Sequence, residues 1–346
     1  MRVLSLFDGI AGARQALKNL NISCQYYACE IDRFAIKVAL SNHDDIKYFS
    51  YFRESGFDVK DLLSDEWEKL PLDIQEIGGY LKQKKVLLEE PINLLIGGSP
   101  CQDLSIAKKN RKGLDGEKSS LFYEYVRILK KCKPQFFILE NVASMSKESK
   151  ELINKELFGI EPILINSSLL TAQQRKRLYW IGKLRGDGNY SKVDIEQPQD
   201  KGILLKDILE NGVAVNNKSN CLTATYYKCS GLRDYVRGGR PVVAEPIRLG
   251  HFNKGSQGDR IYSVQGKSIN LSANGGGKGA KTGLYKINLP NGDYAIRKLT
   301  TIECERLQGF PDNYTISVSN TQAYKCLGNS FTVPVIEHIL RSILKI

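Results

Sequence analysis

The sequence predicts an α/β fold with a central, mainly parallel sheet, together with a smaller, irregular, mainly-β region. In the first half of the chain, short apolar runs alternate with stretches of helical periodicity, which is typical of parallel strands joined by crossover helices. Residues 184 to 296 change to many glycines, scattered polar residues and short β-like runs. With 346 residues, the chain is long enough for one large domain and a smaller one.

The charge of the chain is positive and unevenly distributed. Lys and Arg number 50 against 38 Asp and Glu, a formal net charge of +12. Between Lys218 and Lys286 there are twelve basic residues and three acidic ones. Such a concentration is the electrostatic footprint of a nucleic-acid-binding protein, and a merely solvated basic surface is the alternative.

The eight cysteines include no CxxC pair and no histidine at metal-ligand spacing, so we expect no metal site. The N-terminus has no long apolar region of a signal peptide, and no apolar run reaches membrane-spanning length. Free thiols then indicate a reducing, cytoplasmic setting.

The first expected strand, Val3 to Leu6, runs into a glycine-bearing turn and a helix that continues to Leu20. Such a turn brings the backbone close to a ligand at the start of a helix. The turn lacks the GxGxxG spacing, which argues against NAD or FAD. Its residues are Phe7-Asp8-Gly9-Ile10-Ala11-Gly12.

A second strand, Tyr26 to Cys29, ends at Glu30-Ile31-Asp32, and a helix follows from Arg33 to Ser41. An acid at the end of the second strand of a βαβ unit usually holds ribose hydroxyls, and Glu30 is our candidate. We expect a third strand to close at Asp58 to Leu62, and a mostly helical insertion of unassigned role at 64 to 90.

The apolar run from Ile92 to Ile96 predicts a buried strand, whose end opens at Gly97-Gly98 into Ser99-Pro100-Cys101. Pro100 fixes the backbone before Cys101, which suits a nucleophile presented at the mouth of a sheet. A small buried thiol is the alternative. Residues 102 to 118 are polar and basic, and predict a positively charged loop over this cysteine.

After a helix at Leu121 to Lys131, the buried strand Phe136 to Leu139 ends in Glu140-Asn141-Val142. Parallel strands present their carboxyl ends to one crevice, so we expect Glu140 beside Cys101. A cap for the following helix is the alternative role of Glu140.

Two further extended segments follow, Ile163 to Ile165 and Gln173 to Ile181. Arg175 and Arg177 are two residues apart and share a face of an extended segment. They predict a guanidinium fork for a ligand oxygen, although exposed charges would fit as well.

Residues 218–224 and residues 267–273 are two copies of a short repeat. Each copy runs into a glycine- and Lys/Arg-rich loop suited to reading a DNA groove. Leu299 to Pro311 then predicts a capped helix stopped by glycine and proline. Tyr324 to Ser330 leads into a C-terminal helix from about Pro334 to Leu344.

In this order, the stretches resemble the motifs of the DNA (cytosine-5) methyltransferases, of the stand-alone bacterial or prophage type. The match covers both ends of the chain, but the family's third motif has no clean counterpart, so Asp58 is chosen over Asp61. The matching stretches are Phe7 to Gly12, Ser99-Pro100-Cys101-Gln102, Glu140-Asn141-Val142, Gln173 to Arg177, Glu303 to Pro311 and Gly328-Asn329-Ser330.

The resemblance implies a Rossmann-like S-adenosylmethionine-dependent methyltransferase sheet with a smaller, irregular, mainly-β target-recognition domain. The catalytic and cofactor-binding domain would comprise residues 1–183 and 322–346, and the recognition domain residues 184–321. The implied cofactor-binding residues are Phe7, Asp8, Gly9, Ile10, Gly12, Glu30, Ile31, Asp58, Pro100, Asn329 and Ser330.

The implied reaction transfers a methyl group from S-adenosyl-L-methionine to C5 of a cytosine flipped out of double-stranded DNA. Cys101 would attack C6, protonated Glu140 would act at N3, and Arg177 would hold O2. Arg175 would organise this pair, and Asn141 would brace the Pro-Cys turn. The implied DNA contacts are Gln102, Ser105, Lys108, Lys109, Arg111, Arg233, Arg237 and Arg240.

Three rival functions remain. A cysteine hydrolase would need a base beside the thiol, yet His43, His251 and His338 lie in stretches without catalytic character. The combination of candidate catalytic residues argues against an inactive DNA-binding module. A tRNA cytosine-5 methyltransferase would share fold and chemistry, and the basic region favours duplex DNA over it. We expect a monomer, and the sequence leaves open a separately acting companion restriction endonuclease.

Overall fold

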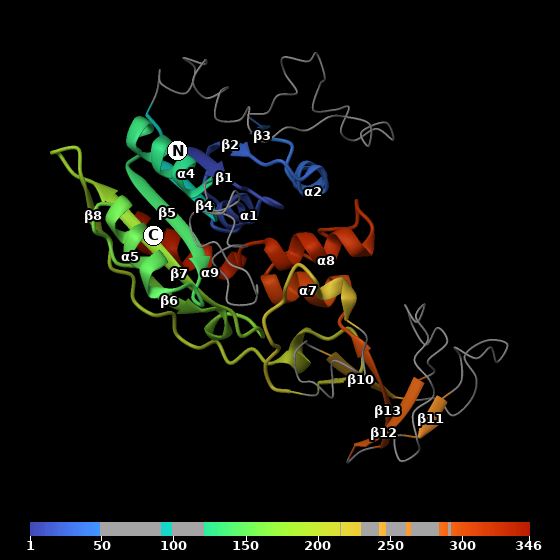
Figure 1. Ribbon diagram of the computed structural model, residues 1–346. Helices are drawn as coiled ribbons and strands as arrows, with labels where there is room; N and C mark the ends of the chain where they lie inside the picture. The colour runs from blue at the N-terminus through green and yellow to red at the C-terminus, as the bar shows by residue number, and fades with distance from the viewer. Residues whose placement is uncertain are drawn as a thin grey trace.

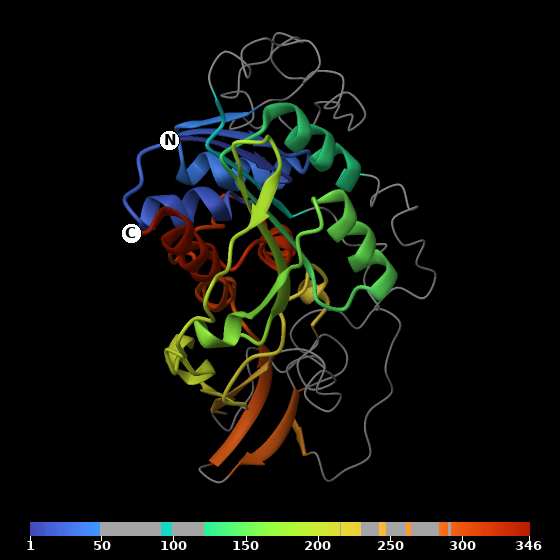
Figure 2. The same ribbon diagram turned by 90° about the vertical axis from the view of Figure 1, so that its left-hand side faces the viewer.

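The computed structural model describes residues 1–48, 91–98, 121–214, 216–229, 242–246, 261–263, 284–289 and 292–346. These residues form two sheets, one of eight strands with helices on both faces and one of five strands. Figure 1 shows the strands β10–β13 projecting away from the larger sheet, and the turned view of Figure 2 agrees.

The larger sheet has the order β3-β2-β1-β4-β5-β7-β6, with β8 paired to β7. Strands β1 to β5 pair in parallel, whereas β7 is antiparallel to β5, β6 and β8. The strands are β1 Arg2–Leu6, β2 Gln25–Cys29, β3 Ile46–Tyr48, β4 Leu94–Gly98, β5 Phe136–Val142, β6 Ile163–Asn166, β7 Lys176–Leu184 and β8 Tyr190–Lys192.

Helices cover both faces of this sheet, and each face has its own apolar core. The helices α4 and α5 bury residues in one core. The helices α1, α2, α7, α8 and α9 bury residues in the other. Their bounds are α1 Gly12–Asn19, α2 Arg33–Asn42, α4 Leu121–Cys132, α5 Lys147–Glu156, α7 Thr301–Gln308, α8 Asn320–Asn329 and α9 Val333–Leu344.

The smaller sheet has the order β11-β12-β13-β10-β9. Its strands are mostly antiparallel, and only β11 and β12 pair in parallel. Three short 3₁₀ helices precede most of these strands: η6 Ser167–Leu169, η7 Leu205–Ile208 and η8 Tyr226–Lys228. The strands are β9 Val213–Ala214, β10 Val242–Pro246, β11 Ile261–Ser263, β12 Leu284–Leu289 and β13 Gly292–Lys298.

Local chemistry explains why α7 begins and ends where the sequence predicts. The Thr300 side chain accepts the N–H of Glu303, and the Glu303 side chain accepts the N–H of Thr300, which makes a reciprocal cap. Gly309 ends the helix in the left-handed conformation, with φ of 79°.

The predicted α/β fold with a parallel-dominated sheet is confirmed. The strand expected at Asp58 to Leu62, the insertion at 64 to 90 and the second copy of the repeat at 267 to 273 lie outside the described residues. Strand β3 and helix α8 were not expected. The domain division at residue 184 stays a prediction; β8, beyond that residue, pairs within the larger sheet.

Candidate active site

The strand that precedes Cys101 and the strand that carries Glu140 end side by side. Strands β4 and β5 are parallel neighbours, and Gly98 is the register partner of Glu140. Cys101 follows Gly98 by three residues and lies outside the described part of the chain. The edge of the sheet that carries Glu140 is therefore the edge from which the chain continues toward Cys101.

Glu140 forms an ion pair with Arg177 of the neighbouring strand β7, with 2.8 Å between Arg177 Nε and Glu140 Oε1. Their side chains are 16% and 14% exposed for Arg177 and Glu140, so the pair is accessible from this edge. The register explains the contact: Glu140 pairs with Tyr179, and Arg177 lies two residues away on the same face. Glu140 does not cap α5, whose N-cap is Ser146.

A close approach of backbone to the carboxylate favours a glycine at position 98. A Cβ atom there would lie 3.0 Å from Glu140 Oε2 and 3.2 Å from Phe331 Cε1. Both distances are tighter than ordinary contact, so a larger residue would push the carboxylate or the Phe331 ring aside. Gly98 thus ends strand β4 and also leaves room for the Glu140 side chain.

Arg175 makes different contacts from Arg177. Its buried guanidinium donates to the carbonyl oxygens of Leu222 (2.9 Å), Gly328 (3.3 Å) and Ser330 (2.9 Å). Burial and the neighbouring Arg177 charge lower the pKa of Arg175. The two arginines predicted to form one fork therefore bind different groups, and a catalytic role of Arg175 stays a prediction.

Asn141 belongs to β5 and is buried. Its side-chain Oδ1 accepts the N–H of Val142, at 2.8 Å. Its predicted bracing of the Pro-Cys turn involves residues outside the described ranges and stays a prediction.

The first turn and the end of β2 meet through Glu30. Glu30 Oε2 accepts the N–H of Gly9 (2.7 Å), and Oε1 accepts those of Ile31 (2.7 Å) and Asp32 (2.8 Å). Burial raises the pKa of Glu30, and these N–H donors act against that rise. The carboxylate is thereby fixed beside the turn, where the sequence predicts the ribose of a nucleotide-like ligand.

Asp8 points inward from the same turn. Its side chain is buried, and the Tyr26 hydroxyl donates to Asp8 Oδ1 at 2.6 Å. Burial raises the pKa of Asp8 to about 7. Its carboxyl group is thus part of the support beneath the turn.

The remaining predicted cofactor residues lie around this turn and at the end of α8. Phe7 adopts a left-handed conformation with φ of 59°, and its side chain and that of Ile31 are partly exposed. Ile10 is buried, and Gly12 begins α1. Asn329 is exposed, whereas the Ser330 hydroxyl donates to backbone oxygens of Leu327 and Phe331.

Many predicted site residues lie outside the described ranges, and their placement stays a prediction. They are Asp58, Pro100, Cys101, Gln102, Ser105, Lys108, Lys109, Arg111, Arg233, Arg237 and Arg240.

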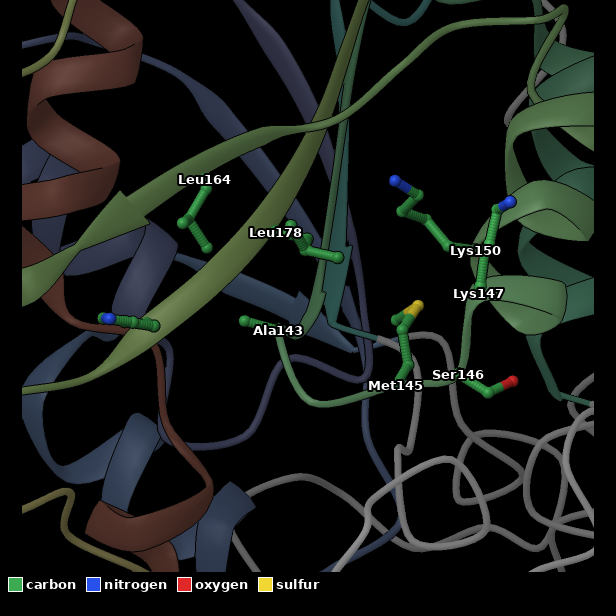
Figure 3. Close-up of a pocket in the computed structure, with 8 residues that line it drawn as sticks. Ala143, Met145, Ser146, Lys147, Lys150, Leu164 and Leu178 are labelled. Carbon is green, nitrogen blue, oxygen red and sulfur yellow. The ribbon is translucent and has the colours of Figure 1, made fainter.

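A pocket of about 450 Å³ lies on the other face of the sheet (Figure 3). Lys147 and Lys150 of α5 line one side, and Leu178 of β7 lies across from them, on the same side as Ala143. Leu178 belongs to the core covered by α4 and α5, whereas Tyr179 on the Glu140 face belongs to the other core. No predicted site residue lines this pocket.

Sequence reasoning assigned no individual role to Gln173 or Lys218. Gln173 Oε1 accepts the N–H of Leu222 at 2.8 Å, and the Lys218 ammonium donates to the carbonyl oxygens of Ser168, Thr171 and Ile203. Gln173 begins the Gln-x-Arg-x-Arg stretch and Lys218 begins the first repeat copy, which marked both positions in the sequence. No local pattern, however, indicates the distant residues that they contact.

Within the part of the chain that the structure describes, no group of three or more His, Cys, Asp and Glu residues could hold a metal ion. None of its helices is both long and apolar enough to cross a membrane.

Residues 1–345 match a family model described as C-5 cytosine-specific DNA methylase. Among curated relatives, the type II methyltransferase M.HhaI of Haemophilus parahaemolyticus is 29% identical, over 99% of this chain and 94% of its own length. The type II methyltransferase M.HpaII of Haemophilus parainfluenzae is 28% identical, over 99% and 88% respectively.

A solved structure of the Entamoeba histolytica methyltransferase EhMeth has a similar fold. Its TM-score is 0.59 at 20% sequence identity, and the match covers 100% of this chain and 98% of that one. At this identity the likeness supports the fold, whereas the family match rests on the sequence.

Proposed function

Because the chain belongs to the C-5 cytosine-specific DNA methylase family, we propose that it methylates C5 of cytosine within a specific double-stranded DNA sequence. The methyl group comes from S-adenosylmethionine, and the reaction proceeds by base flipping and a covalent bond between Cys101 and C6. The observation that carries this proposal is the Glu140–Arg177 ion pair at the strand end beside Gly98, from which the chain continues to Cys101.

The proposed reaction begins because cytosine C5 is a weak nucleophile. The Cys101 thiolate adds to C6, and electron density moves from the C5–C6 bond into the ring, toward N3 and O2. Glu140, in its protonated form, donates a hydrogen bond at N3, and Arg177 binds O2. C5 then takes the methyl group, a base removes the C5 proton, and the thiolate leaves C6 as the double bond re-forms.

The ion pair holds Glu140 and Arg177 together, so that both can contact the same ring. Glu140 and Arg177 come from adjacent antiparallel strands and are held 2.8 Å apart, so a ring that reaches both has its N3 and O2 edge fixed. Positioning of this kind avoids the entropic cost of aligning the reacting groups at each turnover. Such a ring must leave the DNA stack first, at a cost of a few kcal/mol.

The residues at the first turn fit S-adenosylmethionine, which supplies a methyl group on a sulfonium when it is bound. The fixed Glu30 carboxylate sits at the end of β2, where a ribose hydroxyl can donate to it. Phe7, partly exposed in a left-handed turn, offers an aromatic face for adenine. Asn329 and Ser330, at the end of α8, complete the proposed site.

The DNA is proposed to lie along the edge that carries Glu140. The basic loop after Cys101 would close over the extruded nucleotide. The +12 charge of the chain and its concentration between residues 218 and 286 support a polyanionic partner.

The proposal is tested with labelled S-adenosylmethionine and unmethylated plasmid DNA or tRNA. Label in DNA, with bisulfite sequencing locating it at C5 of cytosines within one short sequence, is the expected result. Label only in tRNA would overturn the choice of substrate. The Cys101→Ser variant is the matched control: we expect no methyl transfer, with cofactor binding retained.

A further inference from the structure

We propose that Arg175 is a positioning residue that fixes the segment 219–222 of the recognition region to the turn at the end of α8. The inference rests on the proposed function, since it names what orients DNA over that site. It assigns Arg175 to DNA positioning and leaves the contact with the pyrimidine to Arg177.

The guanidinium of Arg175 joins two segments that are distant in sequence. It donates to Leu222 O on one side, and to Gly328 O and Ser330 O on the other. All three are backbone carbonyls, so the contacts fix main-chain positions instead of single side chains. The planar guanidinium of arginine spreads its N–H donors over three nitrogen atoms, so it can bind several carbonyls at once. The ammonium of lysine has a single nitrogen and cannot reach all of these carbonyls together.

A ladder of hydrogen bonds extends this clamp along the chain. Ser219 N donates to Ala172 O (2.7 Å), and Gln174 N donates to Ser219 O (2.8 Å). Leu222 N donates to Gln173 Oε1 (2.8 Å). The segment from Ser219 to Leu222 is therefore bound by the consecutive residues Ala172 to Arg175.

The contact between this segment and α8 is close enough to require a glycine. A Cβ atom at Gly328 would lie 2.2 Å from Thr223 C and 2.3 Å from Ala224 N. The backbone at 223–224 thus packs directly on α8, and Arg175 binds on either side of this packing.

Tyr226, four residues after Leu222, contacts the point at which the chain leaves the smaller sheet, and we call this contact together with the segment 219–222 the root of that sheet. Leu299 N, directly after β13, donates to the Tyr226 hydroxyl at 2.7 Å. The Tyr324 hydroxyl of α8 donates to Leu299 O at 2.8 Å. Within the described residues, the chain enters β10 at Val242 and leaves β13 at Lys298, which are register partners, and Leu299 then contacts Tyr324 of α8.

A displacement at this root changes where the smaller sheet sits relative to Glu140 and Arg177. The root is held by a few hydrogen bonds between side chains and main-chain atoms, so a small tilt there is amplified over the length of the strands. Loss of the Arg175 contacts should then weaken binding of the duplex more than it slows the reaction of DNA that is already bound.

The test uses full-length Arg175→Lys beside Arg177→Lys as the matched control. We expect Arg175→Lys to weaken binding of the specific duplex by about tenfold or more, since it loses hydrogen bonds to a charged donor. Its single-turnover rate on bound DNA should fall by a smaller factor than its affinity for the duplex. For Arg177→Lys, the larger loss should fall on the single-turnover rate.

The inference would be overturned by an Arg175→Lys variant that binds the duplex normally and reacts at least tenfold more slowly once bound. If Arg175→Lys does not fold, Gln173→Met, which removes the acceptor of Leu222 N, is measured against the same two criteria.

Hydrogen exchange separates this inference from the proposed function. In the folded variant we expect faster exchange at residues 219–226, with β1 and α1 unchanged. A wild-type protein that methylates no DNA would remove the proposed function and leave that exchange result standing. Unchanged exchange at 219–226 would remove the positioning role even in an active enzyme.

Discussion

The Glu140 side chain lies where three parts of the larger sheet meet: the end of β5, Arg177 of β7 and the backbone of Gly98. Its ion pair is partly exposed, so it orients the carboxylate at the sheet edge and contributes little to stability. A change at Glu140 should therefore act on rate and leave folding largely intact.

Replacing Glu140 by Gln should slow methyl transfer by about 10²–10⁴-fold, the usual contribution of a positioned acid. Single-turnover measurements with saturating DNA and cofactor provide the rate. Glu156→Gln is the control, because Glu156 pairs with Lys130 between α5 and α4, away from the site. Equal rates for Glu140→Gln and the wild type would remove Glu140 from the chemistry.

Asp8 should make stability depend on pH. Its folded pKa of about 7 lies above the unfolded value, so the folded state holds the extra proton between about pH 4 and 7. The associated stability is complete below about pH 4 and lost as the pH rises toward 7. Asp8→Asn keeps an acceptor for Tyr26 and avoids burying a charge.

We therefore expect Asp8→Asn to raise the free energy of unfolding by a few kcal/mol at pH 8, on the order implied by the pKa difference, and by little at pH 4.5. Urea denaturation at both pH values measures it. An equal change in the free energy of unfolding at both pH values would show that burial does not raise the pKa of the Asp8 carboxyl group.

At the scale of elements, a buried ion pair attaches the end of β13 to the start of α7. Arg297 Nη1 and Nη2 donate to Glu303 Oε2 and Oε1, both at 2.8 Å, and Nη2 also donates to Asn211 O. Both side chains are buried. Removing one partner would leave the other charge without compensation.

Arg297→Met should lower the free energy of unfolding by about 3–5 kcal/mol, because Glu303 loses its buried partner. Lys130→Met, which breaks the exposed pair with Glu156, should cost at most about 1 kcal/mol. Thermal or urea unfolding of the two variants compares them directly. Equal losses of unfolding free energy would show that burial does not make the Arg297–Glu303 pair more costly to break than the exposed pair.

The elements that the sequence predicts well are those with strong local patterns. The buried run ending at Glu140, the helix Leu121–Cys132 and the capped helix Thr301–Gln308 match expectation within a few residues. Strand β3 has only three residues, and α8 depends on distant contacts such as that of Tyr324 with Leu299, so neither leaves a clear local signal.

The candidate site divides in the same way. The register of β4 and β5 follows from parallel pairing, so Gly98 and Glu140 could be placed together from sequence. The separate partners of Arg175 and Arg177 could not, because the former are carbonyls from residues 222, 328 and 330, brought close only by the fold.

In the whole molecule, three arrangements serve the proposed function: the Glu140–Arg177 ion pair, the turn held by Glu30 and the root of the smaller sheet. Each is supported by contacts between segments far apart in the chain, such as those of Gly9 with Glu30 and of Arg175 with Ser330. Their common purpose in the proposed function is to hold one flipped cytosine against a cysteine and a methyl donor.

The most direct measurement is covalent capture by a duplex amplified with 5-fluorodeoxycytidine triphosphate from a fragment whose methylation site has been mapped. Because fluorine at C5 cannot leave as a proton does, the final elimination is blocked and the sulfur stays on C6. We predict a denaturant-stable protein–DNA adduct that needs S-adenosylmethionine and maps by peptide mass spectrometry to residue 101. Normal methylation of the unfluorinated fragment without any adduct on Cys101 in the fluorinated one would contradict the account.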